Sequence, residues 1–162
     1  MDPEFTSARQ VADDPRVLAF GQLQSAANRL GYLLGRALER ECGITHLTYE
    51  VLLLVGRAGE DGLTMRSIAQ EQVLTTGGAT RLVDRMEALG LVTRTAAPDD
   101  RRGRLVRLTS LGEETAVRAG RLHVEHIEQF FSRPLPGDHR ERFAEDLRTV
   151  SHFARDALPR LR

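Results

Sequence analysis

Apolar residues recur every three or four positions over most of this chain, a spacing that is typical of amphipathic α-helices. The first such stretch covers about residues 15–41, follows Asp14-Pro15 and ends before Gly43. An Asp cap followed by Pro is a common helix start, and Gly a common helix end. Apart from Gln24, one face of this helix is apolar at that spacing: Val17, Phe20, Ala27, Leu30, Leu34, Ala37 and Leu38.

Polar capping residues predict five further helices. The expected caps are Thr48, Thr64, Thr75, Ser110 (with Glu113 three positions on) and Asp138. The helix after Thr48 is expected to end near Gly59, the one over 76–89 at Gly90, and the one after Ser110 near Phe131. The short helix after Thr64 contains Ile68 and Ala69.

Two strand-like runs, Leu91–Ala96 and Arg104–Thr109, interrupt this helical pattern. The polar segment 97–103 between them contains Pro and Gly and predicts a turn. Val106 and Leu108 are expected on one face of the hairpin, Leu105 and Arg107 on the other. The predicted order is four helices, a β-hairpin and two helices, a mainly α fold with a small β-wing.

Composition predicts one soluble globular domain. The chain has 162 residues, 41% of them hydrophobic, and a single cysteine, which suits a reducing cytoplasm. Its longest strongly apolar run, Val51–Val55, is far shorter than the roughly 20 residues of a membrane span. No secretory leader is recognisable, and residues 1–7, MDPEFTS, have the character of a vector-derived tail, so the domain is expected over 8–162.

Positive charge is concentrated in the middle of the chain. All 23 basic residues are Arg and the net charge is zero. Residues 75–109 carry 7 Arg against 4 acids, residues 1–74 carry 7 against 10, and residues 110–162 carry 9 of each. This excess is either statistical scatter or a local binding surface for a polyanion.

The helix over 76–89 has two different faces at 100° per residue. One carries the small or basic residues Thr76, Gly77, Thr80, Arg81, Asp84 and Arg85. The other carries the apolar residues Ala79, Leu82, Val83, Met86 and Leu89. Such a helix is either an ordinary surface helix or a DNA-recognition helix, in which Gly77 and Gly78 let the backbone approach base edges and Arg81 pairs with guanine.

The hairpin tip carries Arg101, Arg102 and Arg104, with Asp100 placed to hold Arg102 in position. An arginine-rich tip is either a solvated turn or a wing that enters a narrow, strongly negative minor groove. A helix-turn-helix followed directly by a basic wing is a more specific sequence signal of DNA binding than either part alone.

Residues 63–114 resemble the MarR family of winged-helix transcription regulators. The matching parts are Thr80–Glu87, Gly90-Leu91-Val92, the tip Asp99–Arg102, Val106–Thr109 and Gly112. The resemblance implies a homodimer, in which helices 15–41 and 110–158 interlock and the winged-helix lobe 45–109 binds DNA. It also implies a pseudo-palindromic operator, repression, and release by a small-molecule effector.

The resemblance assigns DNA contacts by position to Thr75, Thr76, Gly77, Thr80, Arg81, Arg101, Arg102 and Gly103, with Asp84 and Asp100 supporting the wing. Effectors of the family, often phenolic or carboxylate compounds, lie between the dimer helices and the DNA-binding lobe. The residues expected there are Arg36, Arg40, Tyr49, Leu53, Arg118 and His123.

Three other functions stay open. A redox sensor would use Cys42, and a metal sensor would draw on Cys42, His46, His123 and His126, although no metal site or other cofactor is assigned. A winged helix can also bind protein instead of DNA. Catalysis has no recognisable motif, so the chain is not expected to be an enzyme.

Overall fold

The structure is a computed structural model that describes residues 5–97 and 100–158; for Ala97 and residues 100–103 it describes the backbone only. Its helices are α1 (Ala8–Ala12), α2 (Pro15–Cys42), α3 (His46–Ala58), α4 (Met65–Glu71), α5 (Thr76–Ala88), α6 (Ser110–Ile127) and α7 (Arg140–Ala157). Three short helical turns are η1 (Gly59–Asp61), η2 (Glu128–Ser132) and η3 (Gly137–His139). The strands are β1 (Leu63–Thr64), β2 (Val92–Ala97) and β3 (Asp100–Leu108).

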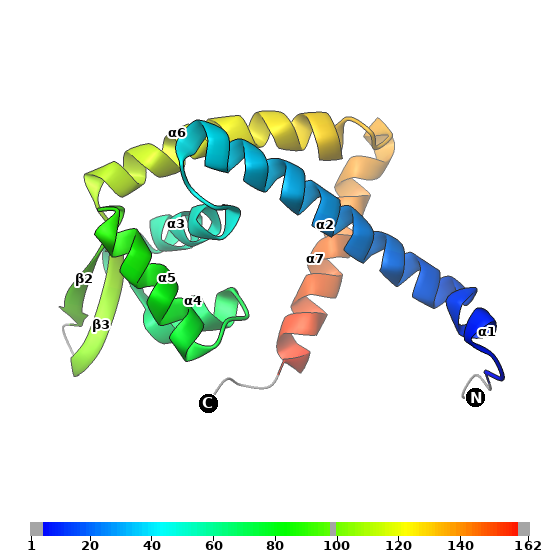
Figure 1. Cartoon of the computed structure of the whole chain (residues 1–162), viewed down its shortest axis with the longest axis horizontal. Coiled ribbons are helices and arrows are strands. Elements are labelled where there is room, and N and C mark those ends of the chain that lie inside the picture. Colours follow the sequence, from blue (N-terminus) through cyan, green and yellow to red (C-terminus); the bar gives the residue numbers. More distant parts are fainter. Residues whose placement is uncertain (1–4, 98–99, 159–162) are drawn as a thin grey trace.

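The fold has a compact lobe and long helices that extend from it (Figure 1). Helices α3, α4 and α5 and the sheet form the lobe, α6 runs over it, and α2 and α7 reach away. The mainly α architecture with a small β-wing is confirmed. In the described part of the chain, no helix combines the length and the apolarity that crossing a bilayer requires.

The sheet contains a strand that the sequence did not predict. All pairs are antiparallel, in the order β1-β3-β2, and Leu63 pairs with Val106 across the β1–β3 edge. β1 has only two residues, too few for an alternating pattern to be recognised. The turn predicted over 97–103 is too long, because β2 reaches Ala97, β3 begins at Asp100 and these two residues pair after a register shift.

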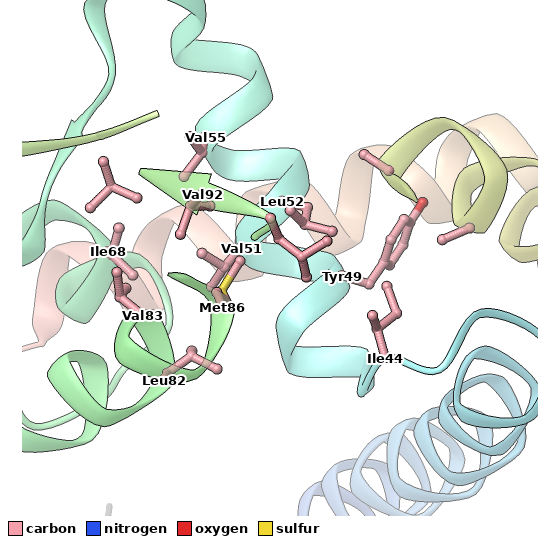
Figure 2. Packing of buried hydrophobic residues seen from close by; sticks show 14 of the residues in the cluster. Ile44, Tyr49, Val51, Leu52, Val55, Ile68, Leu82, Val83, Met86 and Val92 are labelled. Atoms are coloured by element: carbon pink, nitrogen blue, oxygen red, sulfur yellow. The ribbon is translucent and has the colours of Figure 1, made fainter. Parts of the chain in front are cut away.

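The core joins α3, α4, α5 and the sheet, as Figure 2 shows. The largest fully buried side chains are Leu38, Val51, Leu52, Val55, Ile68, Val83, Met86, Val92 and Val106. Leu89, predicted on the buried face of α5, is 57% exposed because it follows the last residue of that helix and caps its end.

Local capping signals set several helix ends as predicted. Asp14 accepts from the backbone N–H of Arg16, and Gly43 ends α2 in the left-handed conformation at φ 70°. The Arg16 side chain and backbone N–H hold the pKa of Asp14 at about 2. Thr64 caps α4 and Thr75 caps α5.

Three predicted caps are wrong. Thr45, not Thr48, caps α3, and Thr48 is buried with its hydroxyl bonded to that of Thr45. Thr109, not Ser110, caps α6, because its hydroxyl accepts from Gly112. Asp138 caps nothing: it lies inside η3, and α7 starts after it without a side-chain cap.

Apolar side chains remain exposed on the helices outside the lobe. Only the end of α2, at Leu34, Ala37 and Leu38, is buried, and α7 has no buried residue in its described length. The exposed ones on these two helices include Val17, Leu18, Phe20, Leu23, Val150 and Phe153. A monomer therefore leaves a large apolar surface without cover.

Candidate nucleic-acid interface

Helix α5 presents its polar face outward, as its sequence predicts. Thr76, Gly77, Thr80, Arg81, Asp84 and Arg85 are exposed. The opposite face is buried through Ala79, Leu82, Val83 and Met86. The polar face is held close to the helix, since Thr80 Oγ1 donates to the Thr76 carbonyl at 2.9 Å and Arg81 Nε donates to the Gly77 carbonyl at 3.3 Å.

Gly77 and Gly78, at the start of α5, differ in what the absence of a side chain achieves. A Cβ at Gly78 would lie 3.2 Å from Thr75 Oγ1, the atom that caps the helix by accepting from the Gly78 N–H. A Cβ at Gly77 would meet nothing closer than Arg81 Nη2, at 3.9 Å. Only Gly77 therefore leaves open surface at the helix start, whereas Gly78 makes room for the cap.

Arg94 links α5 to β2, the first strand of the wing. Its guanidinium, on β2, donates to Asp84 Oδ1 and to Glu87 Oε2, both at 2.6 Å. The Arg94 backbone N–H also donates to Glu87 Oε1, at 3.2 Å. The Arg94 side chain is 21% exposed, so this clamp is partly shielded from water.

The sequence did not single out Arg94. The sequence expected Asp84 to support the wing, and its partner among the described side chains is Arg94 of β2. The sequence signal for this contact was an arginine on a strand, seven and ten residues after two carboxylates on a helix. Only the tertiary fold brings the three side chains together.

The wing tip lies outside the described side chains. The backbone of Asp100, Arg101, Arg102 and Gly103 belongs to β3, and the side-chain roles predicted for them remain predictions. Arg104 pairs in register with Ala96 and is exposed. At least one arginine of the hairpin therefore has its side chain exposed to solvent.

A second feature is a cavity of about 280 Å³ between α3, the end of α4, and α6. It brings together Tyr49, Leu53 and His123 of the predicted effector residues, and adds Arg57, Glu50 and Glu71. Burial raises the pKa of Tyr49, opposed by the charge of Arg57. The cavity thus has aromatic walls and charged groups at its edge.

The other predicted effector residues do not line this cavity. Arg36 and Arg40 are exposed and face Glu39 and Glu41 at 3.5 and 2.8 Å, and Arg118 is exposed. Over the described residues, no group of three or more His, Cys, Asp or Glu is arranged to hold a metal. Cys42 is half-buried, and His126 Nδ1 lies 2.8 Å from the Leu122 carbonyl oxygen.

Comparison with known proteins identifies the family. A model described as "MarR family" matches residues 24–103. The structure of Sco3205 from Streptomyces coelicolor, a MarR family transcriptional regulator in complex with DNA, superposes with a TM-score of 0.77. It is 27% identical, and the alignment covers 93% of this chain and 90% of that one. The chain belongs to the MarR family.

Other MarR-like proteins extend the comparison. CouR from Rhodococcus jostii RHA1, solved with p-coumaroyl-CoA, is 25% identical, with a TM-score of 0.71 over 86% of this chain and 92% of that one. The regulator PapX of Escherichia coli is 34% identical over 70 residues, 43% of each chain. The match therefore spans less than half the length of this curated relative.

Proposed function

We propose that this MarR-family chain is a sequence-specific DNA-binding transcriptional regulator of the cytoplasm, a repressor that binds a pseudo-palindromic operator as a homodimer. The observation that carries the proposal is the outward face of α5, on which Thr76, Gly77 and Arg81 are exposed beside the arginine-bearing wing. Helices of this kind enter a major groove through their N-terminal residues. The likeness to Sco3205, solved with DNA, supports the same use of this face.

The direct test is fluorescence anisotropy with the duplex upstream of the protein's own gene, repeated over a salt series. Binding should be tight, should exceed binding to a scrambled duplex, and should fall steeply with salt because bound phosphates release counterions. Equal, weak binding to both duplexes, followed by no enrichment in a genome-wide selection of bound fragments, would favour a protein-interaction module instead.

Arg81→Ala is expected to weaken operator binding by roughly 1–3 kcal/mol and to relax preference at one base position. The side chain is exposed and close to the open surface of Gly77, where a base edge is accessible. Binding to single-base operator variants measures the effect. A uniform loss on all sequences would make Arg81 a phosphate contact.

Arg102→Ala is expected to weaken DNA binding at least about tenfold, because an arginine in a narrow minor groove meets a strongly negative potential. The circular dichroism spectrum and the mass of the dimer in solution should stay those of the wild type, because the substitution is not expected to unfold the dimer. Unchanged affinity would refute the assignment of this residue to the wing contact.

The homodimer is supported by the uncovered apolar side chains of α2 and α7, such as Phe20 at 61% and Phe153 at 78% exposure. Interlocking of these helices between two copies would bury them, and apolar burial is the main driving force of such interfaces. Light scattering should give twice the 18.1 kDa chain mass. A Phe153→Asp variant should shift towards the monomer, and an unchanged dimer mass in that variant would contradict this interface.

Effector release is proposed for the cavity beside Tyr49 and His123, with a phenolic or carboxylate compound as the ligand. Its aromatic walls and Arg57 suit a ring that carries an anionic group. The structure of CouR with p-coumaroyl-CoA supports this choice, since that ligand is an aromatic acyl compound. A screen of such acids in the anisotropy assay should find compounds that release DNA.

A further inference from the structure

Three aromatic rings meet where the lobe joins α6. His46 begins α3, Tyr49 lies one turn later, and His123 comes from α6. The ring centroid of His123 lies 4.7 Å from that of Tyr49 and 5.3 Å from that of His46. Tyr49 is only 4% exposed. The rings therefore form a main part of the contact between α3 and α6.

One polar atom in this contact has no partner. The Nδ1 atom of His123 is buried, and no hydrogen bond reaches it from the described residues. By contrast, Nδ1 of His126, one turn further along α6, lies 2.8 Å from a backbone carbonyl oxygen. A proton added at His123 would thus create a charge with no hydrogen-bond acceptor at Nδ1, which is costly in a shielded position.

Several charged groups surround the histidine pair. Glu50 Oε1 lies 3.9 Å from His46 Nε2. Arg57 and Glu71 also line the cavity, and His126 lies one turn further along α6. The residue of α2 that lies against His46 is Gly35, which carries no charge. Burial, together with the charges of His46 and His126, lowers the pKa of His123.

The lowered pKa of His123 sets the pH range in which its protonation affects stability. A histidine whose folded-state pKa is lowered contributes its full stability above the unfolded pKa, about 6.5, and this stability is lost as the pH falls below that value and through the lower folded-state pKa. Contacts between α3 and α6 should therefore weaken in mildly acidic solution.

We propose that His123, packed against His46 and Tyr49, is a proton-sensitive joint between α3 and α6, and that protonation of His123 separates the two helices and weakens DNA binding. Helix α3 belongs to the DNA-binding lobe, and α6 to the proposed dimer, so their relative position sets the spacing of the two recognition helices. The inference rests on the proposed function, and it adds the proton as a regulator of the cavity already described.

Two measurements test the joint without DNA. The chain has two tyrosines and no tryptophan, so in a Tyr32→Phe background the emission of Tyr49 reports the contact. The emission should change with a midpoint below about pH 6.5, and urea unfolding should show stability falling over the same range. His123→Phe keeps a ring against Tyr49 and should abolish both effects. His46→Gln removes the repelling neighbour and should move the midpoint to higher pH.

The coupling is tested by anisotropy at fixed salt, with operator affinity compared at about pH 7.5 and about pH 5.5. Affinity should fall at least about tenfold in the wild type and in the control His139→Gln, whose histidine lies outside the cluster, but less than about threefold in His123→Phe. This fall is opposite to the general trend, because protonation makes the protein more positive and strengthens nonspecific DNA binding.

Each result decides a separate claim. No emission midpoint between about pH 4.5 and 6.5 would overturn the joint itself. A midpoint with equal pH dependence of DNA binding in wild type and His123→Phe would overturn the coupling. Absence of DNA binding at about pH 7.5 would overturn the proposed function and the coupling with it, while emission and unfolding would still decide whether the joint exists.

Discussion

Gly112→Ala is expected to lower the free energy of unfolding by about 3 kcal/mol, since forced overpacking of a rigid site costs about this much. A Cβ at this position would overlap the carbonyl oxygen of Leu91 and lie 3.0 Å from its carbonyl carbon. The neighbour is backbone, and it is fixed by the Thr109 N–H, which donates to the same oxygen at 3.1 Å. Either α6 or the start of the wing must move. Urea denaturation measures the loss.

The matched control is Gly120→Ala in the same helix. A Cβ there would lie 3.6 Å from Tyr49 Oη, an ordinary contact distance. Alanine has the higher helix propensity, so this variant should be as stable as the wild type or more stable by up to about 1 kcal/mol. Equal destabilisation by the two substitutions would contradict the packing argument.

Arg94→Gln is expected to weaken operator binding by about 2–3 kcal/mol, or roughly 30- to 150-fold. The substitution removes both charged hydrogen bonds of the clamp, and it leaves Asp84 and Glu87 unneutralised on the helix that faces DNA. It also removes the charged link between α5 and β2. Anisotropy measures affinity. Because Asp84 and Glu87 are 54% and 40% exposed, stability should fall by only about 1 kcal/mol.

A double-mutant cycle separates these effects. In Arg94→Gln with Asp84→Asn, one of the stranded carboxylates is gone, so part of the lost DNA affinity should return. The single variant Asp84→Asn should lose less affinity than Arg94→Gln, because Glu87 still holds the arginine. Strictly additive effects would show that Arg94 acts directly on DNA rather than through the clamp.

Local signals predicted the parts of the fold that depend on neighbouring residues. The caps at Asp14, Thr64 and Thr75 are correct because each bond joins atoms two or three residues apart. The cap predicted at Thr48 is wrong because Thr45, one helical turn earlier and bonded to Thr48 through its hydroxyl, is the cap. Packing decides it, by placing Thr48 inside the helix and in the core.

For the candidate site, the sequence alone determined the polar face of α5 and the presence of a basic hairpin, because helical and strand periodicity specify which residues share a face. The tertiary structure decided which distant residues meet. It placed Arg94 on Asp84 and Glu87, β1 on β3, His123 on His46 and Tyr49, and Gly112 on Leu91. Most of these contacts join residues of different elements that lie far apart in the chain, so no local hydrogen bond or periodicity encodes them.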